Sequence, residues 1–514
     1  MSENSPPVLR RKASRIRGTF PDELFDASVL QPLAVSVDEL LDDAVRDVYR
    51  AHATMLGEQR IADPRAVATI LDAIGRTEDD ATSVLQHPLS RIERSIVSAA
   101  SADVLQGSAP EEIAATAIRM KLRARALTVA ASVVELREAL AELASANPLT
   151  LLLATSNGQV IQPTSLGHYL HAQIGPLART SERLHGCYER LNQSPLGAVS
   201  GMSTAMPVRQ ERVAVLLGFA GIIENSFDAL ASADSFSELV SIVSASALET
   251  TRLVADLQFW ARDDVGLLVP GDEFIHQTGA QPQRRDPLVL DHLRGAFARL
   301  TVAPSEMTAT LLHRPMLPGF VSQIEAFSIV ERVLEQACTA NTLLARVVRS
   351  SVVNRALFAH RANRGFSTSS ELADLLAVDF QLPRVDAHAL AERVVVEWTE
   401  QGGEATTLTP ELIDRVAMSM VGRELGVDPE LLAKCLSPRR FIERRDVPGG
   451  PAPAAVGAAL DRETFALNRE RGWIRDREDE LQQARERLLT RCAQIIASPA
   501  SVTQRAPGTL EAEP

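Results

Sequence analysis

Residues 122–143 read LRARALTVAASVVELREALAEL, and their pattern decides the fold class. Apolar side chains recur there at steps of three and four residues, which places them along one face of an α-helix. These positions are Ala126, Val129, Val133, Leu136, Leu140 and Leu143. Similar stripes occupy 243–257 and 330–348, and small residues among them allow helix axes to approach closely. The patterns predict an all-α protein built around a bundle of long helices.

Interruptions of this periodicity divide the chain into five expected parts. Residues 1–18 are expected to form a flexible basic arm, followed by an N-terminal helical domain over 19–115. The central helical bundle is expected over 116–365 and a C-terminal helical domain over 366–460. An extra charged helix and a loose tail complete the chain over 461–514.

Three segments between the helical stripes are expected to form loops. Ser108–Pro110 and Thr155–Gly158 interrupt helical patterns with turn-forming residues. Asp263–Pro287 is longer and is rich in Gly, Pro, Gln and charged residues. Loops of that length in a compact domain are usually functional or disordered, so this segment is a candidate site.

Composition excludes several classes of function. The chain has 53 Lys and Arg against 66 Asp and Glu, a net charge of −13 that opposes general binding to nucleic-acid phosphates. Its four cysteines form no CxxC pair, which favours a reducing, cytoplasmic location. No apolar run approaches the ~18 residues that a membrane span needs. We therefore expect a cytoplasmic protein without nucleic-acid or membrane partners.

Generic cofactor and metal motifs are also absent from the sequence. There is no P-loop, GxGxxG, GxSxG or HExxH motif. His168 and His171 have a helical i, i+3 spacing that could bring two metal ligands together, but no third ligand lies near them in the sequence. A packed or surface histidine pair is the better interpretation, and we expect neither metal nor cofactor.

The stretch Ser194–Phe219 carries a resemblance to a known family. It reads SPLGAVSGMSTAMPVRQERVAVLLGF and is followed by GIIENSFDALASADSF. This resembles argininosuccinate lyase, of the aspartase/fumarase superfamily, in which SPLGAGALAG, LLGF and ENSLDAVSDRD are typical. QPTSLGHYLHAQIGPLARTSERL at 162–184 and RDVPGGPAP at 445–453 are also similar to family motifs. The resemblance covers residues 20–460, approximately, in the family's order.

This resemblance implies a fold, a reaction and an assembly. Family enzymes form a long helical bundle and remove the proton beside a carboxylate before nitrogen leaves the next carbon, which gives fumarate. A serine on a mobile loop is the base, a lysine and an asparagine hold the carboxylate, and a Thr-His pair assists. Preorganised cations and donors of this kind stabilise developing negative charge. Three segments from different subunits build each site, so the resemblance implies a homotetramer with a small-molecule substrate.

The catalytic loop of this chain departs from the family pattern. Its signature position is 276–287, HQTGAQPQRRDP, where Gly279 replaces the serine. Thr278 is the nearest hydroxyl and the candidate base. Arg284 replaces the lysine and keeps its charge, with Gln283 beside it as a second substrate contact. Asp286 replaces the asparagine, where a carboxylate would repel a substrate carboxylate and could act as a new base or cation contact.

The other motif segments also lose anion-binding side chains. Ser156 and Asn157 replace the Thr-His pair, and a neutral amide cannot carry a proton at pH 7, whereas Gln159 matches the family. SRNDQ becomes Ser108–Glu112, in which Glu111 is a candidate substrate contact, and SDRD becomes Ala231–Asp234. The candidate catalytic residues are therefore Thr278, Asp286 and Ser156, and the candidate substrate-binding residues are Arg284, Gln283, Asn157, Gln159 and Glu111.

Three functions are compatible with these departures. The chain could be an ordinary argininosuccinate lyase, a divergent enzyme acting on a less anionic substrate, or a catalytically inactive scaffold or regulatory protein. We favour the divergent enzyme, in a biosynthetic pathway. Simpler interpretations stay open for two segments: 284–286 as a solvated charged loop, and Glu111–Glu112 as first-turn charge that suits the helix dipole. Fold alone cannot decide, because function depends on the site.

Overall fold

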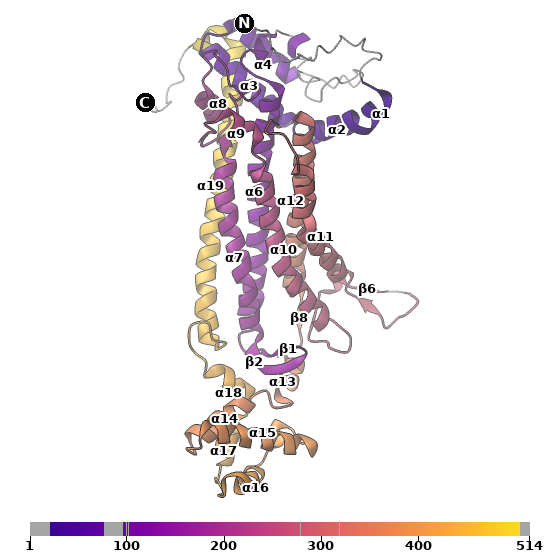
Figure 1. Ribbon diagram of the computed structural model, residues 1–514, viewed down its shortest axis with the longest axis vertical. Coiled ribbons are helices and arrows are strands. Elements are labelled where there is room, and N and C mark those ends of the chain that lie inside the picture. The colour runs from indigo at the N-terminus through magenta and orange to yellow at the C-terminus, as the bar shows by residue number, and fades with distance from the viewer. Residues whose placement is uncertain are drawn as a thin grey trace, which may run out of the picture.

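The computed structural model describes residues 21–76, 96–98, 100, 102–277, 279–317 and 319–503. It confirms the predicted all-α class: an elongated bundle of long helices carries shorter helices at each end (Figure 1). The bundle helices are α6 (Pro110–Ser145), α7 (Leu166–Leu191), α10 (Asp234–Trp260), α11 (Leu288–Leu311), α12 (Phe320–Ser350) and α19 (Pro453–Ala497). The basic arm predicted at 1–18 and the last residues of the predicted tail, 504–514, lie outside the described residues.

The apolar stripes found in the sequence form the core of this bundle. Val129, Val133, Leu136 and Leu140 on α6 are all buried, and α6 packs against α7 and α12. The stripes at 243–257 and 330–348 become α10 and α12. One continuous apolar core joins these helices and extends into the N-terminal end. Burial of these stripes is the main source of bundle stability.

Short helices surround the N-terminal end of the bundle. They are α1 (Glu23–Phe25), the π-helix η1 (Asp26–Leu30), α2 (Gln31–Leu40), α3 (Asp42–Glu58), α4 (Pro64–Arg76), η2 (Ala102–Leu105), α8 (Gln210–Leu216) and α9 (Ser226–Ala231). Most residues of α3 are buried because this helix packs against α4, α6 and α19. The start of α6, which carries Glu111, therefore lies at this end.

The opposite end has a separate core. This end consists of α13 (Arg355–Asn363), α14 (Ser369–Val378), α15 (Arg384–Glu400), η4 (Ala405–Thr407), α16 (Pro410–Val421), α17 (Pro429–Cys435) and α18 (Pro438–Glu443). The buried residues of its separate core come from α14, α15, α16, α17 and the loops between them. From there α19 returns along the bundle to the N-terminal end, where η5 (Pro499–Thr503) follows (Figure 1). The charged helix expected from residue 461 begins earlier, because Pro453 fits the first helical turn.

Short strands interrupt the helices at loops. The paired strands are β1 (Leu151–Ser156) with β2 (Gln159–Ser165), β3 (Gln193–Ser194) with β4 (Gly221–Ile222), β5 (Leu268–Val269) with β8 (Val352–Val353), and β6 (His276–Gln277) with β7 (Arg285–Asp286). The first pair replaces the plain loop expected at Thr155–Gly158. Asn157 and Gly158 have φ values of 52° and 74°, as a two-residue hairpin turn requires.

No helix in the described ranges has the length and apolarity needed to span a bilayer.

Candidate functional site

The SPLG motif loop is held by a buried carboxylate at the start of α6. Glu112 is fully buried, and its Oε2 accepts hydrogen bonds from the backbone N–H groups of Gly197 at 2.6 Å and Val199 at 2.7 Å. Its Oε1 accepts from the Ala109 N–H at 3.2 Å. Gly197 has a φ of 107°, and a Cβ there would lie 2.3 Å from Gln210. Glu112 is thus a clamp between α6 and this loop, which goes beyond first-turn charge.

The LLGF motif is held by a buried guanidinium. Arg123 donates from Nη1 to the Gly218 carbonyl at 2.9 Å and to Asn192 Oδ1 at 2.7 Å, and from Nη2 to the Leu217 carbonyl at 2.5 Å. Its guanidinium also stacks on Phe219, 4.1 Å from the ring centre. Carbonyls at a helix end have no intrahelical partner, so Arg123 satisfies those that follow α8. Arg123 therefore fixes the LLGF motif against α6.

The GGPAP motif is attached to α7 through His168. Its Nε2 lies 3.1 Å from the Gly449 carbonyl oxygen, and its Nδ1 lies 2.8 Å from Thr164 Oγ1. A Cβ at Gly450 would lie 2.2 Å from the Arg445 carbonyl oxygen, so only glycine fits this turn. Both His168 nitrogens therefore have protein partners, as a packed histidine would. No cluster of potential metal ligands occurs among the described residues.

The predicted residues that replace the Thr-His pair lie on an exposed hairpin. Ser156 ends β1, Gln159 begins β2, and Asn157 occupies the turn between them. All three are exposed. Further along β2, Gln162 Nε2 donates to Ser370 Oγ on α14 at 3.1 Å, which ties the hairpin to the C-terminal end. The hairpin presents Ser156 and Asn157 to solvent on a fixed backbone.

The predicted catalytic loop forms a second hairpin, from β6 to β7. Arg284 Nε lies 2.8 Å from Asp286 Oδ1 and 2.7 Å from Oδ2, so the two charges pair within the loop. Arg285 pairs with Asp272. Gln283 is exposed at the turn. Thr278, the candidate base, lies outside the described residues.

The remaining candidate, Glu111, lies in the first turn of α6 and is partly exposed. Figure 1 shows that this turn, the β1–β2 hairpin and the β6–β7 hairpin occupy separate places on one chain. The 36 residues of α6 alone span roughly 54 Å between Glu111 and the end that carries β1. A single chain therefore brings Arg284 and Asp286 together but leaves Ser156 and Glu111 apart from them.

Sequence reasoning missed the buried ionisable groups near Glu111. His52 Nε2 lies 2.9 Å from the carbonyl oxygen of Gln106, just before the 108–112 segment, and burial lowers the pKa of His52 to about 4. Burial raises the pKa of Glu112 to about 7, against the opposing effect of its backbone hydrogen-bond donors. For α6, the sequence does indicate buried charges. Arg119, Arg123 and Arg137 share the helical spacing of its buried apolar residues, and all three are buried.

Comparisons with known proteins identify the family. A family model described as a lyase matches residues 31–300. Argininosuccinate lyase of Halobacterium salinarum is 33% identical over 469 residues, which cover 90% of this chain and 93% of that protein. Argininosuccinate lyase of Methanothermobacter thermautotrophicus is 26% identical over 476 residues, which cover 90% of this chain and 100% of that protein.

Solved structures agree with these relatives. The crystal structure of EDDS lyase in complex with formate matches with a TM-score of 0.80 and 25% identity, covering 91% of this chain and 96% of that one. Class II fumarase from Schistosoma mansoni shares the fold, with a TM-score of 0.64 and 13% identity over 80% of this chain and 91% of that one. The chain therefore belongs to the lyase family, as an argininosuccinate-lyase-like member of the aspartase/fumarase superfamily.

Proposed function

We propose that this chain is a divergent lyase that cleaves a carbon–nitrogen bond in a substrate less anionic than argininosuccinate. A base removes a proton from the carbon beside a carboxylate. The electron pair forms a carbon–carbon double bond as the bond from the next carbon to nitrogen breaks, and the nitrogen, which is already protonated, takes the electrons of that bond and leaves as a neutral amine. The products are an amine and a fumarate-type acid, and the step needs no cofactor.

The pairing of Arg284 with Asp286 carries this proposal. Arg284 occupies the position of the family's carboxylate-binding lysine, and Asp286 neutralises it within the same loop. A substrate carboxylate that approached Arg284 would have to displace Asp286 or accept its repulsion. A substrate with fewer carboxylates, or with a cationic group beside Asp286, avoids this penalty.

The proposed site is shared among subunits of a cytoplasmic homotetramer. Each pocket would combine Ser156, Asn157 and Gln159 of one chain with Gln283, Arg284 and Asp286 of a second chain and Glu111 of a third. The separation of these groups within one chain supports this arrangement, because the residues can meet only between chains. Thr278 or Asp286 would then serve as base, with Ser156 donating to the substrate.

A second candidate function, an inactive scaffold, is favoured by one observation. The family motifs that this chain retains are those that clamp loops to helices, through Glu112, Arg123 and His168. The candidate site residues Ser156, Asn157, Gln283 and Arg284 on the two hairpins are exposed and form no such clamp. A protein kept for its helical frame alone would show this same division.

Fumarate absorbance separates the candidates. The full-length protein is incubated with argininosuccinate, and then, in the reverse direction, with fumarate and a panel of amines that differ in carboxylate number. The proposal predicts little or no cleavage of argininosuccinate and consumption of fumarate with an amine that carries fewer carboxylates. Rapid cleavage of argininosuccinate would support the ordinary enzyme instead. No reaction with any amine, from protein with a cooperative melting transition, would favour the scaffold.

A further inference from the structure

A cavity of about 180 Å³ lies between α3, α6, α8 and α19, apart from every candidate site residue. Its lining contains the ionisable residues Asp43, Asp47, Lys121, Arg123 and Arg485 and the apolar residues Ala44, Met120, Ala124, Leu216, Leu217, Leu481 and Leu488. Pockets for drug-sized ligands typically hold ≈ 300–1,000 Å³, so this cavity suits a smaller molecule.

The interior wall of the cavity is apolar. Leu216, Leu217 and Leu488 are buried and come from two elements, α8 with its following turn and α19. Ala124 on α6 is exposed, so the cavity is open to solvent on that side. A hydrocarbon chain that entered there would cover the accessible apolar surface of Met120, Ala124 and Leu481, which favours binding.

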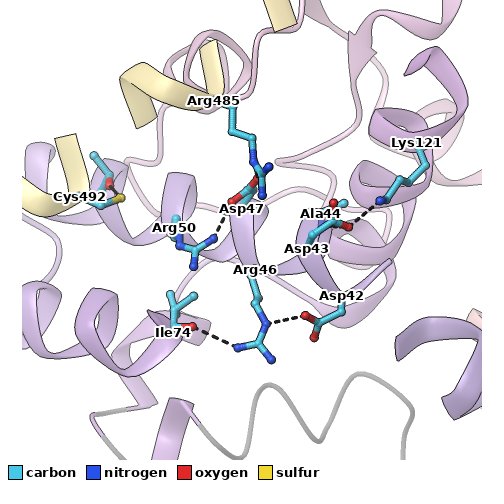
Figure 2. Close-up of polar contacts among 11 residues, drawn as sticks. Asp42, Asp43, Ala44, Arg46, Asp47, Arg50, Ile74, Lys121, Arg485 and Cys492 are labelled. Atoms are coloured by element: carbon cyan, nitrogen blue, oxygen red, sulfur yellow. Dashed lines mark hydrogen bonds and ion pairs between the residues drawn. The ribbon is translucent and has the colours of Figure 1, made fainter. Parts of the chain in front are cut away.

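Two ion pairs lie at the cavity, and both join helices (Figure 2). Lys121 Nζ on α6 lies 2.6 Å from Asp43 Oδ1 on α3, and Arg485 Nε on α19 lies 2.8 Å from Asp47 Oδ2 on α3. Asp47 also pairs with Arg50 at 2.7 Å, so two guanidiniums share one carboxylate. The Lys121 and Arg485 side chains are 31% and 50% exposed, which leaves both cations accessible to a ligand.

A third cation in the lining has no carboxylate partner. Arg123 is 3% exposed, and its hydrogen bonds go to backbone carbonyls and to Asn192. Its Nε has no hydrogen-bond partner within the ranges that the structure describes. A buried charge without an opposite charge is costly. Three lining cations against two lining carboxylates leave one surplus positive charge, and the lining is thus complementary to an anion.

From this combination we infer that the cavity is a binding site for a small aliphatic monocarboxylate. The hydrocarbon chain would lie against Met120, Ala124 and Leu481, and the carboxylate would bind to Lys121 and Arg485 at the rim, beside Asp43 and Asp47. The surplus positive charge of Arg123 in the same lining would offset the repulsion from those two carboxylates, an offset that the Arg284–Asp286 pair lacks. Lys121 is one of three lysines in the chain, whose other basic residues are arginine. The ligand would connect α3, α6 and α19. This site goes beyond the proposed function and does not depend on it, because it shares no residue with the candidate active site.

Binding of octanoate to the full-length protein tests the inference by isothermal titration calorimetry. Octylammonium and octanol serve as probes with the same chain and a different head group. Octanoate is expected to bind at least roughly tenfold more tightly than either probe, because a charge-assisted hydrogen bond contributes enough free energy for that difference. Equal affinity for octanoate and octylammonium would overturn the inference, and so would the absence of octanoate binding.

Rim variants locate the carboxylate. Lys121→Gln and Arg485→Gln are each expected to weaken octanoate binding roughly tenfold, with little change in melting temperature because exposed ion pairs contribute little stability. Lys434→Gln is the matched control, since Lys434 pairs with Glu430 on the distant α17 and is also exposed. Affinity that Lys121→Gln and Arg485→Gln leave unchanged would overturn the placement of the carboxylate.

Filling the cavity locates the hydrocarbon chain. Ala124→Phe places a large side chain at the open side, from an exposed helical position where it does not disturb the core. Octanoate binding is expected to disappear while the melting temperature stays near that of the unmodified protein. Unchanged octanoate affinity in this variant would contradict the proposed binding site. This test measures binding alone and is therefore independent of the proposed lyase activity.

Discussion

The loops that carry the SPLG and LLGF motifs differ from the β1–β2 and β6–β7 hairpins in how deeply the polar groups that contact them are buried. We call the first two the motif loops. In the motif loops, Glu112 and Arg123 are buried and hydrogen-bond to fixed backbone atoms of other segments. In the hairpins, Ser156 and Asn157 face solvent, and the one ion pair of Arg284 among the described residues is with Asp286, two residues away. Substitution of Glu112 or Arg123 leaves buried hydrogen-bonding groups without a partner. Substitution of a hairpin residue alters the exposed surface instead.

This difference predicts which motif positions tolerate substitution. A buried donor or acceptor that loses its partner costs ≈ 1–3 kcal/mol, so substitutions at the clamps are expected to destabilise the fold. Exposed hairpin residues carry no such penalty and are free to change with the substrate, or to drift once a substrate is lost. The comparison therefore distinguishes residues that hold loops against the helical bundle from residues that would act on a substrate.

The largest loss of stability is expected when a charged residue buried in the helical bundle is replaced. Arg137 is 1% exposed and joins α6 to α19, with Nε 2.8 Å from Glu463 Oε1 and Nη1 2.7 Å from Glu470 Oε2. Arg137→Met would leave both carboxylates buried without their cation. Removing one partner of a buried pair costs ~3–5 kcal/mol, so we expect a large fall in melting temperature, measured by calorimetry.

Arg349 provides the surface counterpart for this test. It contacts three carboxylates, those of Glu135, Glu138 and Glu142, but is 33% exposed. Arg349→Met should change stability by less than ~1 kcal/mol, because solvent screens exposed pairs. Similar losses in Arg137→Met and Arg349→Met would contradict the distinction between buried frame and exposed surface.

Activity should show the reverse pattern. Arg284→Ala removes the cation that the proposed mechanism uses to stabilise developing negative charge, and such donors contribute ≈ 10²–10³ in rate. We expect a loss of that size in fumarate addition to the accepted amine, with an unchanged melting temperature. Arg285→Ala is the neighbouring control, because Arg285 pairs with Asp272 instead. Undiminished turnover in Arg284→Ala would remove Arg284 from the site.

The buried ionisable residues at the N-terminal end of the bundle also predict that stability depends on pH. Burial lowers the pKa of His52 to about 4, below the usual 6.5, so the folded protein binds fewer protons there than the unfolded chain. Stability from His52 is therefore complete above pH 6.5 and is lost as pH falls toward 4. That pKa difference corresponds to about 3 kcal/mol.

A neutral replacement isolates this effect from other titrating groups. His52→Gln keeps a side-chain donor for the Gln106 carbonyl and cannot titrate, so its stability should fall less than that of the unmodified protein between pH 6.5 and pH 4. Glu112 acts in the opposite direction: its raised pKa makes its contribution decline as pH rises from 4.5 through 7. Melting temperatures of both proteins across this range provide the measurement, and parallel curves would exclude His52 as the cause.

The bundle could be predicted from sequence because helical stripes are local. The spacing at 122–143 alone indicates a one-faced helix, and α6, α10 and α12 coincide with three such stripes. The β1–β2 hairpin was missed because its two short strands lie between two long helices and, in the part of the chain that the structure describes, pair with no third strand. Its Asn157–Gly158 turn was the available signal, since this dipeptide favours the conformation that joins two strands.

The site was less predictable because its contacts are not local. Motif register identified Arg284 and Asp286 as candidates, and their pairing could have been anticipated because the two opposite charges lie two residues apart in the sequence. The clamp from Glu112 to Gly197 could not, because the partners lie 85 residues apart and meet only in the folded chain. The proposed meeting of Ser156 with Arg284 requires a second chain, and one sequence contains no direct signal for it.

The smallest expected effect concerns Asp286, which the proposed function treats as a restraint on Arg284. Asp286→Asn frees the guanidinium to bind a carboxylate, so fumarate affinity is expected to rise a few-fold, measured by calorimetry. The melting temperature should stay constant, because the exposed pair contributes less than ~1 kcal/mol. Asp272→Asn frees Arg285 in the same manner and should leave fumarate binding unchanged. Weaker fumarate binding in Asp286→Asn would mean that Asp286 contacts or orients the ligand, and the hairpin would then belong with the residues retained for chemistry.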